Sequence, residues 1–272
     1  MIELANGELV VTVLDANRDR HLLGTRYCAA GYIFQIEDPE LGPLMSGPTY
    51  PEAFDWFNGQ GIPDSFAASP LHPQRVDDPS VLVLGVGLCT RDLSSVLCFD
   101  DWSVETQSGH AIVCTVLHRL EHIEVRIRRA VSLVGRTVVS STTVSNLSDD
   151  QFAFSWFPHP FFPYPRSAEL VRFSTPVSVP EGRVFESSTN GFICRRGAVP
   201  AEGEYAALSH QSGRGLTVIQ RHPLLGLVAA DMDFSPTLLP IWGNDRTFSW
   251  EPHHDRSLAA GESVSWSVSY HF

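Results

Sequence analysis

The segment ESVSWSVSYHF, residues 262–272, decides the fold class because large and polar side chains alternate along its length. The large side chains and the polar ones between them are, in turn, Val264, Trp266, Val268, Tyr270 and Phe272, and Ser263, Ser265, Ser267, Ser269 and His271. Successive side chains of a β-strand point to opposite faces of its sheet. The pattern predicts a strand with one face packed on a core and the other turned to solvent or to the floor of a groove.

Further segments repeat this strand pattern along the chain. The clearest are GELVVTVLD (7–15), SVLVLGVGL (80–88), HIEVRIRRAVSLV (122–134), RTVVSSTTVSNL (136–147) and GRGLTVIQRH (213–222). Clusters of Gly, Asn, Asp and Ser separate the segments, and no stretch of 12 or more residues has a clear helical period. The pattern favours an all-β chain with large antiparallel sheets, a sandwich or a barrel, built as one domain over residues 1–272.

Composition and charge exclude several classes of function. The chain of 272 residues is 43% hydrophobic and carries a formal net charge of −12, from 31 acidic and 19 basic residues. A field of that sign repels phosphate backbones, so nucleic-acid binding is not expected. All the basic residues are Arg, which excludes a Schiff-base lysine and a P-loop lysine.

The cysteines and the distribution of apolar residues predict where the protein is located and how it assembles. The five cysteines are odd in number and form no CxxC pair, so reduced thiols are expected. The N-terminus has no basic region followed by an apolar run, and no apolar run approaches ~20 residues. We expect a cytoplasmic protein, a monomer or a homodimer, that makes no membrane contact.

The segment FSWFPHPFFPY, residues 154–164, contains the first candidate functional residue, His159. Pro158 and Pro160 lack backbone N–H groups, so they place His159 at the end or edge of a strand. The surrounding aromatic residues predict a half-buried ring, whose pKa burial would lower and a neighbouring carboxylate would raise. His159 is then a structural residue at a strand end, a metal ligand, or a proton donor at the mouth of a pocket.

A second candidate, Glu251, lies in RTFSWEPHHD, residues 246–255. It follows an apolar run, where a carboxylate is costly unless it is paired or faces a cavity. A surface acid in a loop is the alternative. The histidines that follow, His253 and His254, suggest a metal site, but neighbouring residues on an extended chain point to opposite sides and do not easily share one ion.

Several planar polar and aromatic side chains are of the types that hold sugar hydroxyls and stack on sugar rings. The candidates for substrate binding are Arg26, Trp56, Asn58, Gln60, Arg91 and Trp242. Each has a plain alternative, since most Arg side chains lie on the surface and a Trp such as Trp242 also packs in cores.

Three motifs together resemble the galactose mutarotase superfamily of aldose 1-epimerases, which includes hexose-6-phosphate mutarotase-like members. His159 with Phe161-Phe162 is similar to the motif that carries the family's catalytic His. Glu251-Pro252 is similar to the late motif with the catalytic Glu, and the strand after Gly261 to the closing strand of the family. The family's second His, in an HGG-like segment, has no counterpart, and FNGQG (57–61) occupies that zone.

The resemblance implies a galactose mutarotase-like β-supersandwich with a concave binding groove, which the polar face of residues 263–271 could floor. It also implies that Glu251 acts as general base and protonated His159 as general acid on a small-molecule sugar or sugar phosphate. No metal or other cofactor is implied. The two side chains would lie about 5–8 Å apart, with sugar oxygens between them at ~3 Å from each.

Two other functions stay open. The first is a non-catalytic carbohydrate-binding protein on the same fold. The second is a cupin-like metalloenzyme that uses His159, Glu251 and either His253 or His254.

Overall fold

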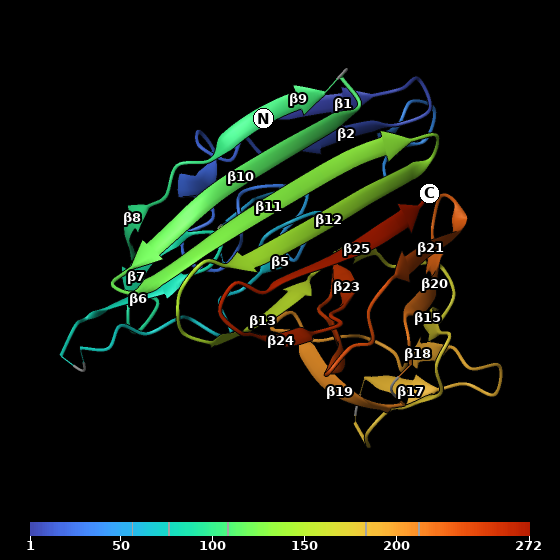
Figure 1. The fold of residues 1–272 in the computed structure, drawn as a ribbon. Coiled ribbons are helices and arrows are strands. Elements are labelled where there is room, and N and C mark those ends of the chain that lie inside the picture. Colours follow the sequence, from blue (N-terminus) through green and yellow to red (C-terminus); the bar gives the residue numbers. More distant parts are fainter. Residues whose placement is uncertain (56, 76, 108, 183, 212) are drawn as a thin grey trace.

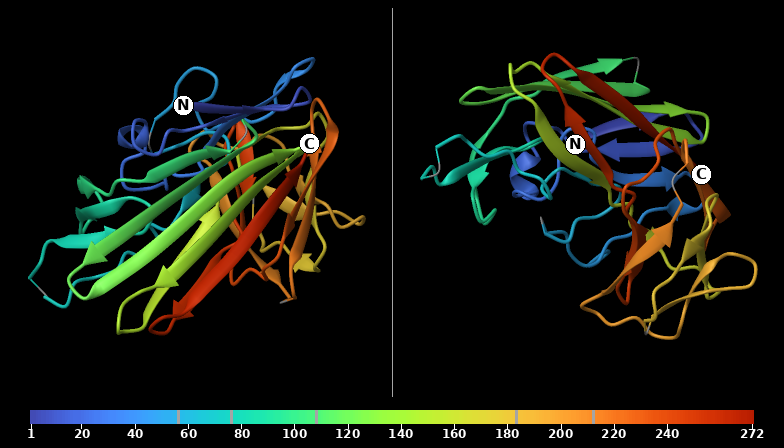
Figure 2. Two further views of the ribbon diagram at one scale, coloured as in Figure 1. Left: turned by 45° about the horizontal axis from the view of Figure 1, so that its top comes forward. Right: turned by 60° about the horizontal axis from the view of Figure 1, so that its bottom comes forward.

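The strands predicted from the sequence form antiparallel sheets, and the largest of them has ten strands. The computed structural model describes residues 1–55, 57–75, 77–107, 109–182, 184–211 and 213–272. In spatial order the ten strands are β17 (Phe185–Ser187), β18 (Ile193–Arg195), β15 (Glu169–Phe173), β20 (Leu216–His222), β21 (Gly226–Met232), β25 (Ser263–His271), β12 (Thr137–Asn146), β11 (Ile123–Val134), β10 (Ala111–Leu120) and β9 (Ser103–Gln107). The long strands β10, β11, β12 and β25 lie side by side, and the sheet then bends toward β21, β20 and β15 (Figures 1 and 2).

Four smaller sheets complete the molecule. They are β1 (Ile2–Ala5), β2 (Val10–Val13), β3 (Ile33–Asp38) and β4 (Gly42–Pro43); β6 (Ser80–Val83), β7 (Gly87–Thr90) and β8 (Val96–Phe99); β24 (His254–Leu258), β13 (Phe152–Pro158) and β5 (Asp64–Ser65); and β14 (Phe162–Pro163), β23 (Thr247–Trp250), β22 (Leu239–Gly243), β19 (Glu204–His210) and β16 (Val177–Ser178). In the described residues the one helical element is a 3₁₀ turn, η1 (Arg20–Leu22), and no helix is long and apolar enough to cross a bilayer. The all-β prediction is confirmed.

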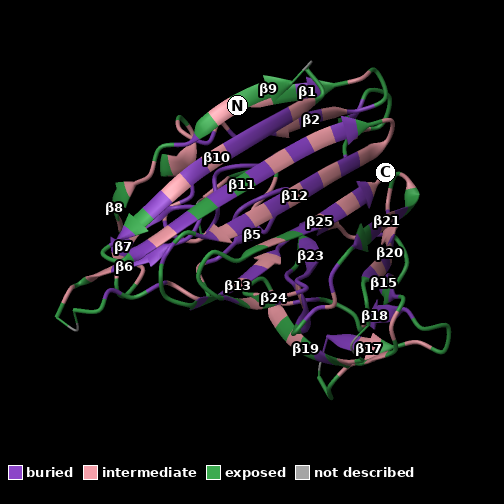
Figure 3. Ribbon diagram, viewed as in Figure 1, coloured by how far each residue is buried: buried purple, intermediate pink, exposed green. Residues whose placement is uncertain are grey.

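Strand β25 has the two faces that residues 262–272 predict. Trp266, Val268 and Tyr270 are buried, whereas Ser263 and Ser265 are exposed and Ser267 and Ser269 are half-buried (Figure 3). The hydroxyl of Ser265 lies 2.8 Å from that of Thr143 on the neighbouring strand β12. The polar face therefore lies on the outer surface of the sheet, which is the first of the two alternatives that the pattern left open, and no residue of β25 lines the cavity described below.

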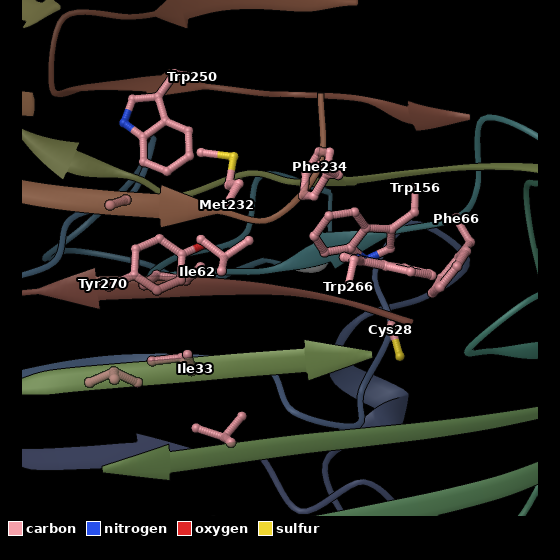
Figure 4. Close-up of a cluster of buried hydrophobic side chains, with 14 of the residues drawn as sticks. Cys28, Ile33, Ile62, Phe66, Trp156, Met232, Phe234, Trp250, Trp266 and Tyr270 are labelled. Atoms are coloured by element: carbon pink, nitrogen blue, oxygen red, sulfur yellow. The ribbon is translucent and has the colours of Figure 1, made fainter. Parts of the chain in front are cut away.

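The core lies between the large sheet and the smaller ones and is rich in aromatic rings. Trp156 of β13 and Trp266 of β25 have ring centroids 5.2 Å apart, and Figure 4 shows them close to Phe66. Burial of a large apolar side chain contributes roughly 1.5–3 kcal/mol to folding. These contacts fix β13, the strand that leads to His159, against the large sheet.

A buried ion pair also joins the large sheet to the three-stranded sheet. The guanidinium of Arg129 on β11 contacts the carboxylate of Asp64 on β5, and both side chains are almost wholly inaccessible. Arg129 also donates to the hydroxyls of Thr142, at 2.9 Å, and Ser140, at 3.3 Å. A buried charge without its partner is strongly destabilising. The pair therefore holds β5 in place, and β5 is the strand beside the end of β13.

Candidate active site

His159 lies directly after the end of β13, as its two flanking prolines predict. The backbone N–H of His159 donates to the carbonyl of Pro63 at 2.8 Å, and that of Phe161 donates to the carbonyl of Gly61 at 2.8 Å. The backbone N–H groups of His159 and Phe161 therefore stay hydrogen-bonded where the chain leaves the strand. The imidazole ring is buried against Phe161, with ring centroids 4.3 Å apart.

Glu251 lies directly after β23, whose four residues are all buried. Its backbone N–H donates to the carbonyl of Pro240 at 3.0 Å, which holds the end of β23 against β22. The carboxylate oxygen Oε1 lies 3.2 Å from Nε2 of His159, and the two side chains are only 9% and 5% exposed. The imidazole and the carboxylate thus meet in direct contact.

The register of two strands explains this contact. Strand β14 pairs with β23 so that Phe162 lies opposite Phe248 and Pro163 opposite Thr247. The ladder ends at Phe162 and Phe248, and its register counted three residues further matches His159 with Glu251, in keeping with the 3.2 Å contact. Side chains directly opposite one another on antiparallel chains lie within contact distance. The expected separation of about 5–8 Å is therefore wrong, and no sugar oxygen fits between the two groups.

A cavity of about 260 Å³ adjoins this pair. It is lined by Arg26, Pro48, Phe57, Asn58, His159, Phe161, Glu202 and Trp242. Trp242 on β22 presents its indole edge-on to the imidazole, with centroids 5.8 Å apart and planes at 72°. The cavity thus brings together four of the residues singled out in the sequence, namely Arg26, Asn58, His159 and Trp242.

Two of these residues are held by local contacts in the N-terminal half. Arg26 donates to the carbonyl of Phe57, and its guanidinium carbon lies 4.6 Å from the centre of the Phe57 ring. The amide nitrogen Nδ2 of Asn58 donates to Asp55 at 2.7 Å. Oδ1 of Asn58 has no hydrogen bond within the described part of the chain, so it can accept one from a ligand hydroxyl.

The other predicted binding residues are not among those that line the cavity. Gln60 is buried, with its side-chain amide 3.5 Å from the carbonyl of Phe34. Arg91 is exposed at the turn after β7, where its guanidinium donates to the carbonyl of Asp78 at 2.9 Å. Trp56 lies outside the described residues. Glu202, which does line the cavity, was not singled out in the sequence; the signal available was the turn sequence PAEG (200–203) directly before β19.

The electrostatics of the pair follow from its burial. Burial raises the pKa of Glu251 to about 7, although the positive charge of Arg26 opposes the rise. Burial lowers the pKa of His159 well below its usual value, and Arg26 lowers it further. Near neutral pH the imidazole is neutral and the carboxyl is partly protonated. The two groups in contact therefore titrate as one unit, which holds one proton below about pH 7 and loses it above that pH.

The neighbouring histidines do not join this site. His253 stacks on Phe157, with centroids 4.4 Å apart and planes at 16°, whereas His254 packs against Phe234 at 4.4 Å. The two rings thus lie on opposite sides of the chain, as expected for adjacent extended residues. Within the described ranges no three His, Cys, Asp or Glu side chains are arranged to hold a metal ion, so these residues do not support the hypothesis of a cupin-like metalloenzyme.

Comparison with known proteins identifies the fold of the chain through solved structures, but it finds no match in sequence. No protein-family profile and no curated protein sequence matches the chain. Among solved structures it is similar to a galactose mutarotase related enzyme from Lactobacillus acidophilus (TM-score 0.63, 13% identity, 99% of this chain and 97% of that one). It is also similar to galactose mutarotase-like proteins from Lactobacillus casei (0.59, 12%, 100% and 99%) and Clostridium acetobutylicum (0.57, 13%, 99% and 94%). The chain therefore has the galactose mutarotase-like fold, and the resemblance seen in the motifs is confirmed at that level.

Proposed function

We propose that the protein is an aldose 1-epimerase, a mutarotase that interconverts the α and β anomers of a hexose or hexose phosphate. The observation that carries the proposal is the 3.2 Å contact between His159 Nε2 and Glu251 Oε1 beside a cavity lined by side chains of the types that hold sugar hydroxyls. The galactose mutarotase-like fold supports it. Since the cavity and its buried pair draw on residues from Arg26 to Glu251, we treat residues 1–272 as one functional domain.

The reaction needs one base and one acid that act on two oxygens of the same carbon. The base removes the proton of the C1 hydroxyl, a C1=O double bond forms, and the bond from C1 to the ring oxygen breaks. Its electron pair stays on the ring oxygen, which takes a proton from the acid. Rotation about C1–C2 and the reverse proton transfers close the ring on the other face. Each proton-transfer group contributes roughly 10²–10⁴-fold to the rate.

The close contact suits this chemistry. Two oxygens bonded to one carbon lie closer together than two hydrogen-bonded atoms do, so a pair of groups in contact can reach both oxygens, one each. A pair that shares one proton always contains one acid and one base. With the proton on Glu251, His159 takes the hydroxyl proton and Glu251 protonates the ring oxygen. With the proton on His159 the roles are those that the resemblance implies.

The cavity residues supply binding and orientation. Trp242 offers an indole surface to the apolar face of the sugar ring, and Asn58 and Arg26 offer hydrogen bonds to hydroxyl groups. These contacts hold C1 beside the imidazole. Proton transfer by the two side chains needs no cofactor.

The test is anomer exchange followed by polarimetry over a panel of hexoses and hexose 6-phosphates. The wild type is expected to accelerate exchange of at least one sugar, and His159→Asn and Glu251→Gln are each expected to abolish the acceleration. His122→Asn, on the turn between β10 and β11, is a matched control that should keep it. Full activity in both site variants, with unchanged folding by circular dichroism, would reject the proposal.

A non-catalytic carbohydrate-binding protein is the second candidate. The small exposed fractions of the two side chains, 5% and 9%, favour it, because a ligand in the cavity can contact Trp242 and Asn58 without reaching Glu251. Calorimetric binding of a hexose by a protein that leaves the exchange rate of that hexose unchanged would establish this second function.

A further inference from the structure

The described residues that line the cavity include one charged side chain of each sign. Of the described residues that line it, Arg26 is the one cation and Glu202 the one anion. Glu251, which contacts His159, adds a second carboxyl group. A ligand that brings negative charge into this space therefore meets the carboxylate of Glu202 as well as the guanidinium of Arg26, whereas Glu251 does not line the cavity and is partly protonated near neutral pH.

The single cation, Arg26, is partly engaged by contacts within its own loop. Arg26 donates to the carbonyl of Phe57, and its guanidinium carbon lies 5.0 Å from the centre of the Tyr27 ring. A guanidinium that binds a phosphate usually presents two parallel N–H donors to it. One N–H of Arg26 is held by its own loop, and no second Arg lines the cavity in the described ranges, so a phosphate would meet a single cation there.

Glu202 is held at the cavity by a tight turn. The N–H of Gly203 donates to the carbonyl of Pro200 at 3.0 Å, and Gly203 has a φ of +87°. A Cβ atom at Gly203 would lie 2.6 Å from Cζ2 of Trp242, so this glycine is what lets the turn rest directly on the indole. Strand β19 begins at the next residue and pairs Tyr205 with Trp242. The backbone at Glu202 is thus fixed from both sides.

The carboxylate of Glu202 has no compensating partner. Within the described part of the chain it forms no hydrogen bond and no ion pair, and its residue is exposed. An uncompensated charge at the rim of a site changes which ligands approach it and makes their binding depend on salt. Repulsion between this carboxylate and an anionic ligand would disfavour binding of that ligand relative to a neutral one.

The volume restricts the ligand as well. About 260 Å³ lies below the roughly 300–1,000 Å³ of pockets that hold drug-sized molecules. A single sugar ring is the ligand that this space favours.

We propose that Glu202 is a specificity-determining residue, which restricts the site to neutral aldoses of a single ring and excludes those with an anionic group, such as a 6-phosphate. This inference rests on the proposed function and narrows its substrate class. Glu202 acts on the approach and binding of the sugar and takes no part in proton transfer.

The experiment compares kcat/KM for anomer exchange of glucose and of glucose 6-phosphate, measured with the full-length wild type, Glu202→Gln and Glu40→Gln. Both variants remove one negative charge, but Glu40 lies in the exposed turn between β3 and β4. The wild type is expected to favour glucose. Glu202→Gln is expected to raise the ratio for glucose 6-phosphate over glucose roughly twofold to fivefold, and Glu40→Gln to leave that ratio unchanged. The preference of the wild type should also weaken at 0.5 M salt, while that of Glu202→Gln should not.

The outcomes separate the two proposals. Exchange that is faster for glucose 6-phosphate than for glucose, or a ratio that Glu202→Gln leaves unchanged, overturns the inference and leaves the mutarotase proposal standing. No acceleration of either sugar by the wild type overturns the mutarotase proposal itself, and with it this inference.

Discussion

Replacing Glu251 with Gln is expected to stabilise the folded protein more and more as pH rises from about 4.5 to 8. Burial raises the pKa of Glu251 from 4.5 to about 7, so in this interval the folded chain keeps a proton that the unfolded chain releases. The free energy of unfolding falls with rising pH wherever the folded state binds more protons. Gln does not titrate and is spared this loss. Since one pKa unit corresponds to about 1.4 kcal/mol, the gap between 4.5 and about 7 amounts to about 3 kcal/mol.

Urea unfolding at pH 5, 6, 7 and 8 measures this effect as the difference in free energy between the variant and the wild type. Titrating groups other than the contacting His159 are common to both proteins and cancel, and Glu40→Gln, an exposed acid, controls for the loss of one charge. The difference should grow by about 2.5 kcal/mol between pH 5 and pH 8, because part of the total change falls below pH 5, and it should level off above pH 7. A difference that stays constant within about 0.5 kcal/mol would refute the reasoning, because Glu251 would then ionise like an exposed acid.

Three further results are expected. Asp64→Asn leaves the buried guanidinium of its partner without a counter-charge and should lower the free energy of unfolding in urea by about 3–5 kcal/mol; a loss under 1 kcal/mol would contradict the buried pair. The kcat/KM for anomer exchange should fall above about pH 7, where Glu251 loses its proton and the site its acid, so a pH–rate profile that stays flat to pH 9 would count against the shared proton. Gly203→Ala should displace Trp242 and weaken hexose binding about tenfold by calorimetry, whereas Gly261→Ala, at a similar φ of +72° but with open space around its Cβ position, should not; equal affinity in both would show that the contact has no effect on binding.

The strands and their ends could be predicted from the sequence because their signals are local. The alternation in residues 262–272 depends on which side chains stand next to one another, and β25 reproduces it. The prolines around His159 likewise set the end of β13 through the N–H groups they lack. The residues that line the cavity also include Arg26, Asn58 and Trp242, whose planar side chains suit a sugar.

The contact between His159 and Glu251 could not be predicted in detail, because it follows from how β14 and β23 pair. Registers between strands distant in sequence are set by packing over the whole sheet. The dependence on long-range packing also explains why some of the predicted binding residues do not line the cavity. Arg91 and Gln60 have suitable side chains, but hydrogen bonds to Asp78 and to Phe34 hold them apart from the cavity. Glu202 was missed because a turn, rather than a strand, brings it to the site.

The most direct test of the central claim is the rate at which the protein exchanges the anomeric proton signals of a hexose, measured by NMR magnetisation transfer at equilibrium. We predict that the wild type raises this rate well above the spontaneous one, and that Glu251→Gln, although still folded and able to bind the sugar, returns it to the spontaneous value. An exchange rate that the substitution leaves unchanged would contradict the account, because the imidazole and the carboxyl would then not be the pair that moves the protons.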